Sequence, residues 1–221
     1  MYEYKKLKDK ILILKNNKEL LTPNKNFLCA STTKMAKSIV NELKKFEYLD
    51  QYKTPVSFLA FFSSNLIETD KNMIIKKIIE EVFFDNILYR SNKNEELNTL
   101  MNKKFNKYIT KFRCIFQIDL ILIEDLVSGQ QKLKTDNLYD YLKGLDNYQI
   151  TLFYKLMQIS KSVILSYSLM NRMFGFLKFK RLINFENDFQ SRKWGITAEQ
   201  KVINLEMQKN IKNFSIFFNN F

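Results

Sequence analysis

The feature that most constrains the fold is a change in apolar periodicity near residue 32. Within residues 10 to 30, short apolar runs at 11–14, 20–23 and 27–30 alternate with Asn- and Lys-rich turns, which is typical of strands joined by tight connections. From residue 32 onward, apolar residues recur every three or four positions, the spacing of a helix face. The sequence therefore predicts an α+β fold that is predominantly α-helical, with a small N-terminal β-meander followed by a multihelical domain.

The same patterns predict where the elements begin and end. Residues 1–50 are expected to form a small β-rich domain with the first helix, and residues 51–221 a helical domain. The first helix should follow Ser31-Thr32-Thr33, since a hydroxyl side chain is a favoured N-cap, and should end near Phe46. The stretch 119–127 fits either a strand or a buried helix, and 128–131 is expected to be a loop. Further helices are expected at 55–67, 73–83, 97–112, 136–144, 146–172 and on both sides of Gly195.

The final helix has a recognisable start and an apolar face. Thr197 and Gln200 have the spacing of a capping box, in which each side chain bonds the other residue's backbone N–H. An apolar stripe is expected to run from Ile203 to Phe221 at helical spacing.

The chain is strongly basic. It has 36 Lys and Arg residues against 23 Asp and Glu, a formal net charge of +13, which favours acidic partners such as nucleic acid, anionic lipid or an acidic protein surface. Lys and Asn are abundant while Gly and Pro are scarce, as in proteins encoded by AT-rich genomes. Part of the excess charge therefore reflects codon usage, and charge by itself does not select a partner.

Residue types needed for common catalytic sites are missing. The chain has no His, the commonest general base and metal ligand, and its four Gly residues are isolated, so there is no phosphate-binding loop. Cys29 and Cys114 lie in apolar contexts and are interpreted as buried thiols of a reducing compartment. We therefore expect no cofactor, no metal and no enzymatic activity.

One class of enzyme, using only carboxylates, is compatible with this composition. Its candidates are the adjacent pairs Glu80 with Glu81 and Glu124 with Asp125. Neighbouring residues on a helix point about 100° apart. Neither pair is therefore expected to converge on a substrate.

No segment is expected to enter a membrane. The longest apolar run, 163–177, contains Asn171 and Arg172 and is shorter than the roughly 20 apolar residues that span a bilayer, so it is predicted to be a buried helix. Residues 1–7 lack a secretory apolar core and an Arg-rich presequence. This favours the cytoplasm of an AT-rich bacterium or a trimmed protein of the mitochondrial matrix.

A distinctive group of residues lies near the C-terminus. Glu186, Gln190 and Trp194, the chain's one Trp, are spaced at i, i+4 and i+8, which places them along one helix face. Gly195 follows, suited to a left-handed C-cap. Two interpretations stay open: a surface that docks a partner, or an ordinary polar helical pair beside a core Trp.

Five blocks across about 190 residues, in the same order and at compatible spacing, resemble the family of ATP synthase assembly factor twelve, the chaperone of the alpha subunit of the catalytic head. The chain departs from the family at Leu43, Met101 and Phe105, where members have Trp, Gln and Trp, and at Asn187, where they have a second acidic residue. The blocks are Thr22-Pro23 with Phe27-Leu28; Ala36, Ile39, Val40, Asn41 and Glu42; Thr54-Pro55-Val56-Ser57-Phe58-Leu59 to Asn65-Leu66-Ile67; Asp85-Asn86-Ile87-Leu88-Tyr89-Arg90; and Glu186, Phe189, Gln190, Trp194 and Gly195.

The resemblance implies a non-enzymatic chaperone that is a monomer when free. It would bind the unassembled ATP synthase alpha subunit and prevent its aggregation until the beta subunit replaces it in the catalytic hexamer. The partner-binding residues implied are Glu186 as polar anchor, Gln190 as its hydrogen-bonding neighbour, Trp194 as aromatic contact or supporting residue, and Gly195.

The alternative is a basic helical protein that binds RNA or an organellar ribosome, in which nucleic acid would be the partner. Its strongest support is the stretch from Phe176 to Arg181, where basic and aromatic residues are densest.

Overall fold

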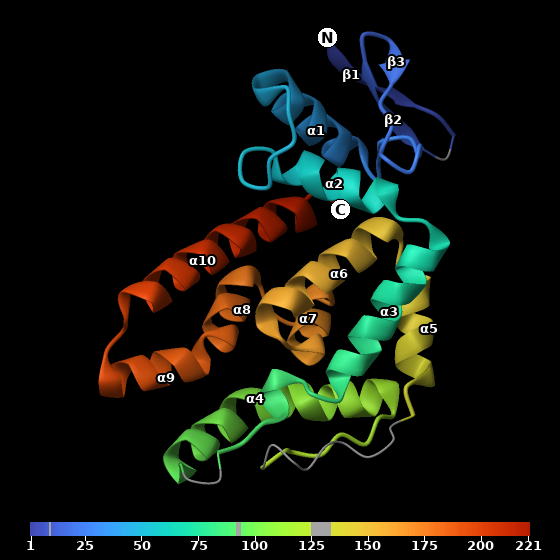
Figure 1. Ribbon diagram of the computed structural model, residues 1–221. Helices are drawn as coiled ribbons and strands as arrows, with labels where there is room; N and C mark the ends of the chain where they lie inside the picture. The colour runs from blue at the N-terminus through green and yellow to red at the C-terminus, as the bar shows by residue number, and fades with distance from the viewer. Residues whose placement is uncertain (9, 92–93, 125–133) are drawn as a thin grey trace. The chain divides into compact units, whose positions relative to one another are not determined.

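The computed structural model describes residues 1–8, 10–91, 94–124 and 134–221, and it confirms a predominantly helical α+β fold with a small N-terminal sheet (Figure 1). The chain forms two compact units, described separately below. The first contains Met1–Asn72, Leu145–Lys155 and Glu206–Phe221, and the second contains Met73–Gly144 and Leu156–Leu205. The division at residue 50 is a different one and stays a prediction.

The sheet of the first unit is built around one apolar strand. Its strands are β1 (Tyr2–Lys6), β2 (Ile11–Lys15), β3 (Lys18–Glu19) and β4 (Cys29–Ala30), and β2 pairs antiparallel with each of the others. Residues 11–14 are buried because both faces of β2 are covered. The sequence pattern missed β1, whose alternating Tyr and charged residues contain no apolar run. The strand predicted at 20–23 is reduced to one bridge between Leu21 and Phe27.

The helices begin at local sequence signals. Thr32 is the N-cap of α1 (Thr33–Phe46), and its hydroxyl accepts from the backbone N–H of Met35 at 3.0 Å. Pro55 occupies the first turn of α2 (Pro55–Asn65), where its missing N–H costs nothing. The other helical elements are α3 (Glu68–Val82), the 3-10 turn η1 (Asn86–Leu88), α4 (Glu95–Phe116), α5 (Asp136–Gly144), α6 (Asn147–Ser160), α7 (Val163–Met170), α8 (Phe176–Ile183), α9 (Phe185–Trp194) and α10 (Ala198–Phe218).

The helix predicted at 146–172 is wrong in one respect, since it is two helices. α6 ends at Ser160, Lys161 has φ +51°, and Ser162 caps α7 by accepting from the N–H of Leu165. The hydroxyl of Ser160 donates to the carbonyl of Ser162 and stabilises the break. The buried helix predicted at 163–177 likewise stops at Met170, and α8 begins only at Phe176.

Two further expectations are settled by the structure. Residues 119–124 contain no helix, and Ile123 forms a parallel bridge with Tyr89; residues 125–131 lie outside the described residues. Cys29 is half-buried, but Cys114 is exposed, contrary to prediction, because it faces outward between the buried Phe112 and Phe116 on α4. No helix within the described ranges combines the length and apolar character needed to cross a membrane.

Candidate functional site

The early sequence blocks supply contacts that hold the fold together. In the first unit, Glu42 of α1 reaches the N-terminus of α2, where one carboxylate oxygen accepts from Val56 N at 3.2 Å and the other from Ser57 N at 2.7 Å and Ser57 Oγ at 2.6 Å. The N-cap residue, Thr54, makes no capping bond itself. Glu42 therefore replaces the usual cap, and burial raises the pKa of its carboxyl.

In the second unit, Asp85 does the same for another helix. It is fully buried, its Oδ2 accepts from Ile164 N at 2.9 Å in the first turn of α7, and its Oδ1 accepts from Ile87 N at 3.2 Å. Burial raises the pKa of Asp85 to about 6, although the backbone donors oppose that shift.

Arg90 is the last residue of the block that begins at Asp85. Its guanidinium donates to the carbonyl oxygens of Ile87 and Tyr89 at 2.8 and 2.7 Å and to Asn102 Oδ1 at 2.8 Å. Only 7% of Arg90 is exposed. The donors of Arg90 are therefore used in holding η1 against α4.

The C-terminal block is different because it lies at the surface. Glu186 and Gln190 of α9 are exposed, and Gln190 Nε2 donates to Glu186 Oε1 at 3.2 Å, so the two share one face as the i, i+4 spacing predicts. Trp194 is 73% exposed. The core interpretation of Trp194 is therefore excluded, and the residues expected to bind a partner are accessible.

Gly195 ends α9 with a conformation that needs glycine. Its φ is +80° and its ψ is −177°, and its N–H donates to Ser191 O at 2.9 Å. The positive φ was expected, but the ψ is extended and not that of the left-handed helical cap. Nothing lies within 4 Å of the position a Cβ would take, so a larger residue would be disfavoured by backbone strain and not by collision.

The opposite face of α9 anchors it to α4. Phe189 is buried, and the Phe185 ring packs edge-on against Phe105 with centroids 5.8 Å apart. Lys193 Nζ lies 3.1 Å from Glu96 Oε2 and 4.8 Å from the Phe189 ring centroid. Phe185 and Phe189 point away from Glu186, Gln190 and Trp194, whereas Lys193 lies beside Glu186 on the helix surface. The face carrying Glu186, Gln190 and Trp194 is exposed.

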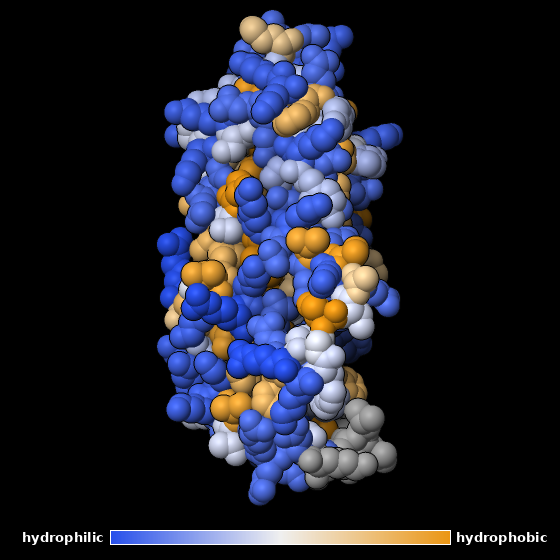
Figure 2. All heavy atoms as spheres, turned by 90° about the vertical axis from the view of Figure 1, so that its left-hand side faces the viewer, coloured by the Kyte–Doolittle hydropathy of each residue, from blue (hydrophilic) through white to orange (hydrophobic). Residues whose placement is uncertain are grey.

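Apolar exposure continues beyond Trp194. Val202 is 64% exposed and Leu205 58%, and Ile196 and Ile203 are also exposed. On the side of the molecule shown in Figure 2, apolar residues interrupt the hydrophilic surface at several places. We call residues 186–205 the α9–α10 segment. It combines a polar pair, one large aromatic ring and several aliphatic side chains.

The predicted apolar stripe of α10 is therefore only partly covered. Of the predicted stripe, Ile211 and Phe214 are buried and Phe218 and Phe221 are half-buried, whereas the first two turns of the helix expose their aliphatic residues. The capping box is also half-formed: Thr197 Oγ1 accepts from Gln200 N at 3.1 Å, but the Gln200 side chain donates to Asn204 Oδ1 instead.

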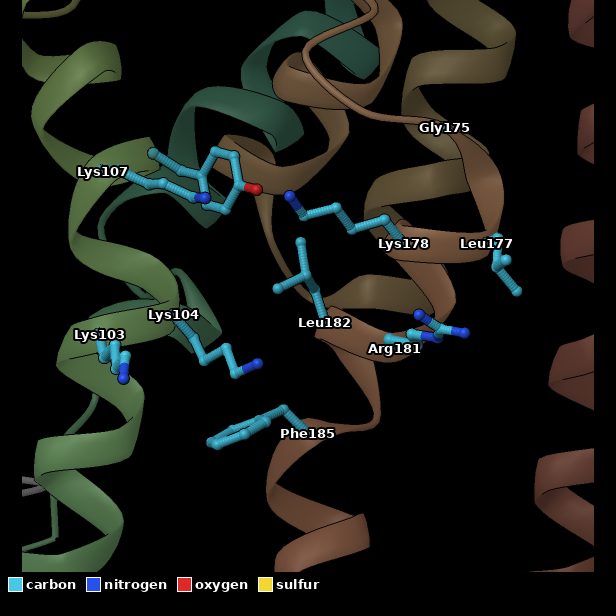
Figure 3. A pocket seen from close by; sticks show the side chains of 10 residues that line it. Lys103, Lys104, Lys107, Gly175, Leu177, Lys178, Arg181, Leu182 and Phe185 are labelled. Carbon is cyan, nitrogen blue, oxygen red and sulfur yellow. The ribbon is translucent and has the colours of Figure 1, made fainter.

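A basic groove lies between α4 and α8, and sequence reasoning missed it. Its volume is about 610 Å³, and it joins Lys103, Lys104 and Lys107 of α4 to Lys178 and Arg181 of α8. Figure 3 shows Lys104 and Lys107 pointing toward α8, and Lys178 and Leu182 pointing back toward α4. The spacing of Lys103, Lys104 and Lys107 marks a basic helix face, but nothing in the sequence says which helix it meets.

The candidate catalytic pairs do not gain support. Glu80 and Glu81 are adjacent on α3, Glu124 is exposed, and Asp125 lies outside the described residues. In the part of the chain that the structure describes, no three His, Cys, Asp or Glu side chains are close enough together to hold a metal ion.

Comparisons with known proteins agree with the fold. Atp12 from Paracoccus denitrificans superposes with a TM-score of 0.86 at 16% sequence identity, covering 99% of this chain and 95% of its own. A point mutant of that organism's Atp12p superposes with a TM-score of 0.88 at 17% identity, covering 99% of this chain and 94% of its own. The Atu1473 protein of Agrobacterium tumefaciens, a proposed chaperone, superposes with a TM-score of 0.86 at 16% identity, covering 99% of this chain and 83% of its own.

Matches at the sequence level are narrower. No curated protein matches the chain. A family profile described as ATP12 chaperone protein matches residues 2–113, slightly more than half of the sequence. The chain therefore belongs to the ATP12 family of chaperones, which act in ATP synthase assembly.

Proposed function

We propose that this protein binds the unassembled alpha subunit of ATP synthase and keeps it from aggregating until the beta subunit takes its place. Membership of the ATP12 family supports the chaperone class. The observation that supports the α9–α10 segment as the binding surface is the exposure of Trp194 beside the Glu186–Gln190 pair. The proposal contains no catalytic step, and the free protein is expected to be a monomer.

The composition of the α9–α10 segment suits such a client. Subunit faces in an obligate ring are apolar and aggregate when unpaired. A holding surface therefore needs aromatic and aliphatic contacts, with a few polar groups to fix orientation. Trp194, Val202 and Leu205 supply the first, and Glu186, oriented by Gln190, supplies the second.

Trp194 is the expected centre of the binding energy. A large ring that is 73% exposed in the free protein has most of its surface available for burial, and Trp is enriched among residues that dominate protein interfaces. Glu186 can accept a charge-assisted hydrogen bond from a donor on the client. Gly195 then directs the chain from α9 toward α10.

The test is suppression of aggregation of purified alpha subunit, followed by light scattering. Equimolar protein should keep the alpha subunit soluble, and adding beta subunit should release this protein from the complex. Purified beta subunit serves as the control client and should not be protected. Equal protection of alpha and beta, or none of alpha, would contradict the proposal.

A further inference from the structure

The basic groove between α4 and α8 concentrates positive charge that no acidic side chain lining it neutralises. Lys103, Lys104, Lys107, Lys178 and Arg181 line it, and no acidic side chain does. None of these five cations forms an ion pair within the described residues. Clustered like charges repel one another at this range. The groove is therefore complementary to an anionic ligand.

The ammonium groups are held in position by aromatic rings. Lys107 Nζ lies 5.1 Å and Lys178 Nζ 6.0 Å from the Tyr108 ring centroid, and Lys104 Nζ lies 5.9 Å from that of Phe185. Lysine contacts of this kind stabilise a cation above a ring. Three of the five charges are thus oriented in the groove before any ligand arrives.

A buried hydroxyl provides a second, independent indication of a ligand. Tyr108 is only 5% exposed, lines the groove, and its hydroxyl has no hydrogen-bond partner. A buried polar group without a partner is unfavourable. An anion in the groove would give this hydroxyl an acceptor.

We infer that the groove binds an acidic segment of a protein, one that carries aspartate or glutamate side chains together with an apolar residue. The groove contains Leu182 and Phe185 beside the cations, so its ligand needs apolar as well as anionic groups. Single-stranded RNA would need free ring faces for stacking. Here lysine ammonium groups already lie over the rings of Tyr108 and Phe185.

The groove and the proposed client surface share helix α9. Phe185, which lines the groove, is the first residue of α9, and Glu186 follows it in the sequence and points to a different side of the helix. That the acidic segment belongs to the alpha subunit rests on the proposed function. One stretch of the alpha subunit would then contact the α9–α10 segment, and an acidic stretch of it would occupy the groove. Charges of this type speed association and fix orientation.

The test uses a short labelled peptide rich in glutamate with interspersed leucine, and its counterpart with every glutamate replaced by glutamine. Fluorescence anisotropy should show binding of the acidic peptide and little of the amide peptide. The triple variant Lys104→Glu, Lys107→Glu, Lys178→Glu should bind the acidic peptide about tenfold or more weakly. All three lysines are exposed, so the fold should survive.

A matched variant separates the groove from overall charge. Lys76→Glu, Lys77→Glu, Lys134→Glu makes the same charge change at exposed lysines that do not line the groove and should alter peptide binding by less than about twofold. An equal loss in both variants would overturn the inference. Tyr108→Phe should lower the affinity for the acidic peptide by about two- to tenfold without lowering the melting temperature. Unchanged affinity would exclude the hydroxyl from the site.

Two more measurements complete the test. If a single-stranded RNA oligomer binds the groove more tightly than the acidic peptide, the site is a nucleic-acid site and the inference is wrong.

The second measurement is aggregation of the alpha subunit in the presence of wild-type protein or of the triple variant at Lys104, Lys107 and Lys178, called the groove variant. If wild-type protein fails to protect alpha but binds the peptide through the groove, the proposed function fails alone. If wild type and groove variant protect alpha equally, the groove is not a client site even though the chaperone function stands.

Discussion

Three carboxylates, Glu42, Asp85 and Glu186, lie in the sequence blocks that resemble the family, and they fall into two groups. Glu42 and Asp85 each accept hydrogen bonds from backbone N–H groups at the start of a neighbouring helix. Glu186 lies on the surface with Gln190 as its partner. The same functional group thus maintains the fold in two regions and is available for binding in the third. Hydrogen bonding, and not residue type or order in the sequence, distinguishes them.

This comparison predicts that removing a buried carboxylate lowers stability, whereas removing the exposed one changes only binding. The reason is that a buried N–H without an acceptor costs about 1 to 3 kcal/mol, while an exposed side chain is replaced by water. The substitutions below test this separation.

Asp85→Ala should have the largest effect. It leaves the backbone N–H groups of Ile87 and Ile164 without their acceptor inside the protein, and we expect a loss of about 3 kcal/mol in the free energy of unfolding at pH 7. Urea denaturation measures it. Asp140→Ala is the control, since Asp140 is exposed on α5 and should stay within about 0.5 kcal/mol of wild type. A similar change in the free energy of unfolding for the two variants would contradict the distinction between buried and exposed carboxylates.

The pH dependence of the Asp85→Ala effect sharpens the comparison. The pKa of Asp85 is about 6 in the folded protein against 3.8 ordinarily, so between these pH values the folded state holds the extra proton. The resulting stabilisation is full below about pH 3.8 and is lost as the pH rises through about 6. Asp85→Ala should therefore cost about 3 kcal/mol more at pH 3.8 than at pH 7. A cost that grows with rising pH would contradict the assignment.

Glu42→Ala should have an intermediate effect. It removes the acceptor for the first N–H groups of α2, and loss of a helix cap typically costs about 0.5 to 2 kcal/mol. Glu42→Gln should cost less because one oxygen is retained. Both are measured by thermal unfolding beside Glu80→Ala, whose side chain is exposed on α3. If Glu42→Ala melts like Glu80→Ala, Glu42 does not cap α2.

Trp194→Ala should change stability little and binding strongly. The ring is 73% exposed, so its loss should shift the free energy of unfolding by no more than about 0.5 kcal/mol. Affinity for the alpha subunit should fall by about 2 kcal/mol or more, as for the central aromatic residue of an interface. Calorimetry and a binding titration provide the two values. Destabilisation without loss of binding would reverse the interpretation.

The sequence predicted those parts of the fold that depend on local signals. Thr32 caps α1 as expected, Pro55 begins α2, and Gly195 ends α9. It failed where distant contacts contribute. At the break after Ser160, the Asp85 carboxylate accepts from Ile164 N and the Asn86 N–H donates to the Lys161 carbonyl, while the apolar periodicity continues through the break.

The candidate site shows the same limit. The spacing of Glu186, Gln190 and Trp194 placed them on one helix face. That this face is exposed depends on the packing of Phe185 on Phe105 of α4 and on the burial of Phe189. The groove was missed because its lysines come from α4 and α8, about 70 residues apart in the sequence. No periodic pattern reports a meeting of that kind.

The most direct test of the account is Glu186→Gln, measured in parallel for melting temperature and for affinity toward the alpha subunit. Glu186 is exposed, so the free energy of unfolding should change by no more than about 0.5 kcal/mol. Binding should weaken by about 1.5 to 3 kcal/mol, the usual value of a hydrogen bond to a charged group. A variant that melts normally yet binds more weakly is the predicted result. A variant that melts far lower, or that binds alpha as tightly as wild type, would contradict the assignment of Glu186 as a partner-binding residue.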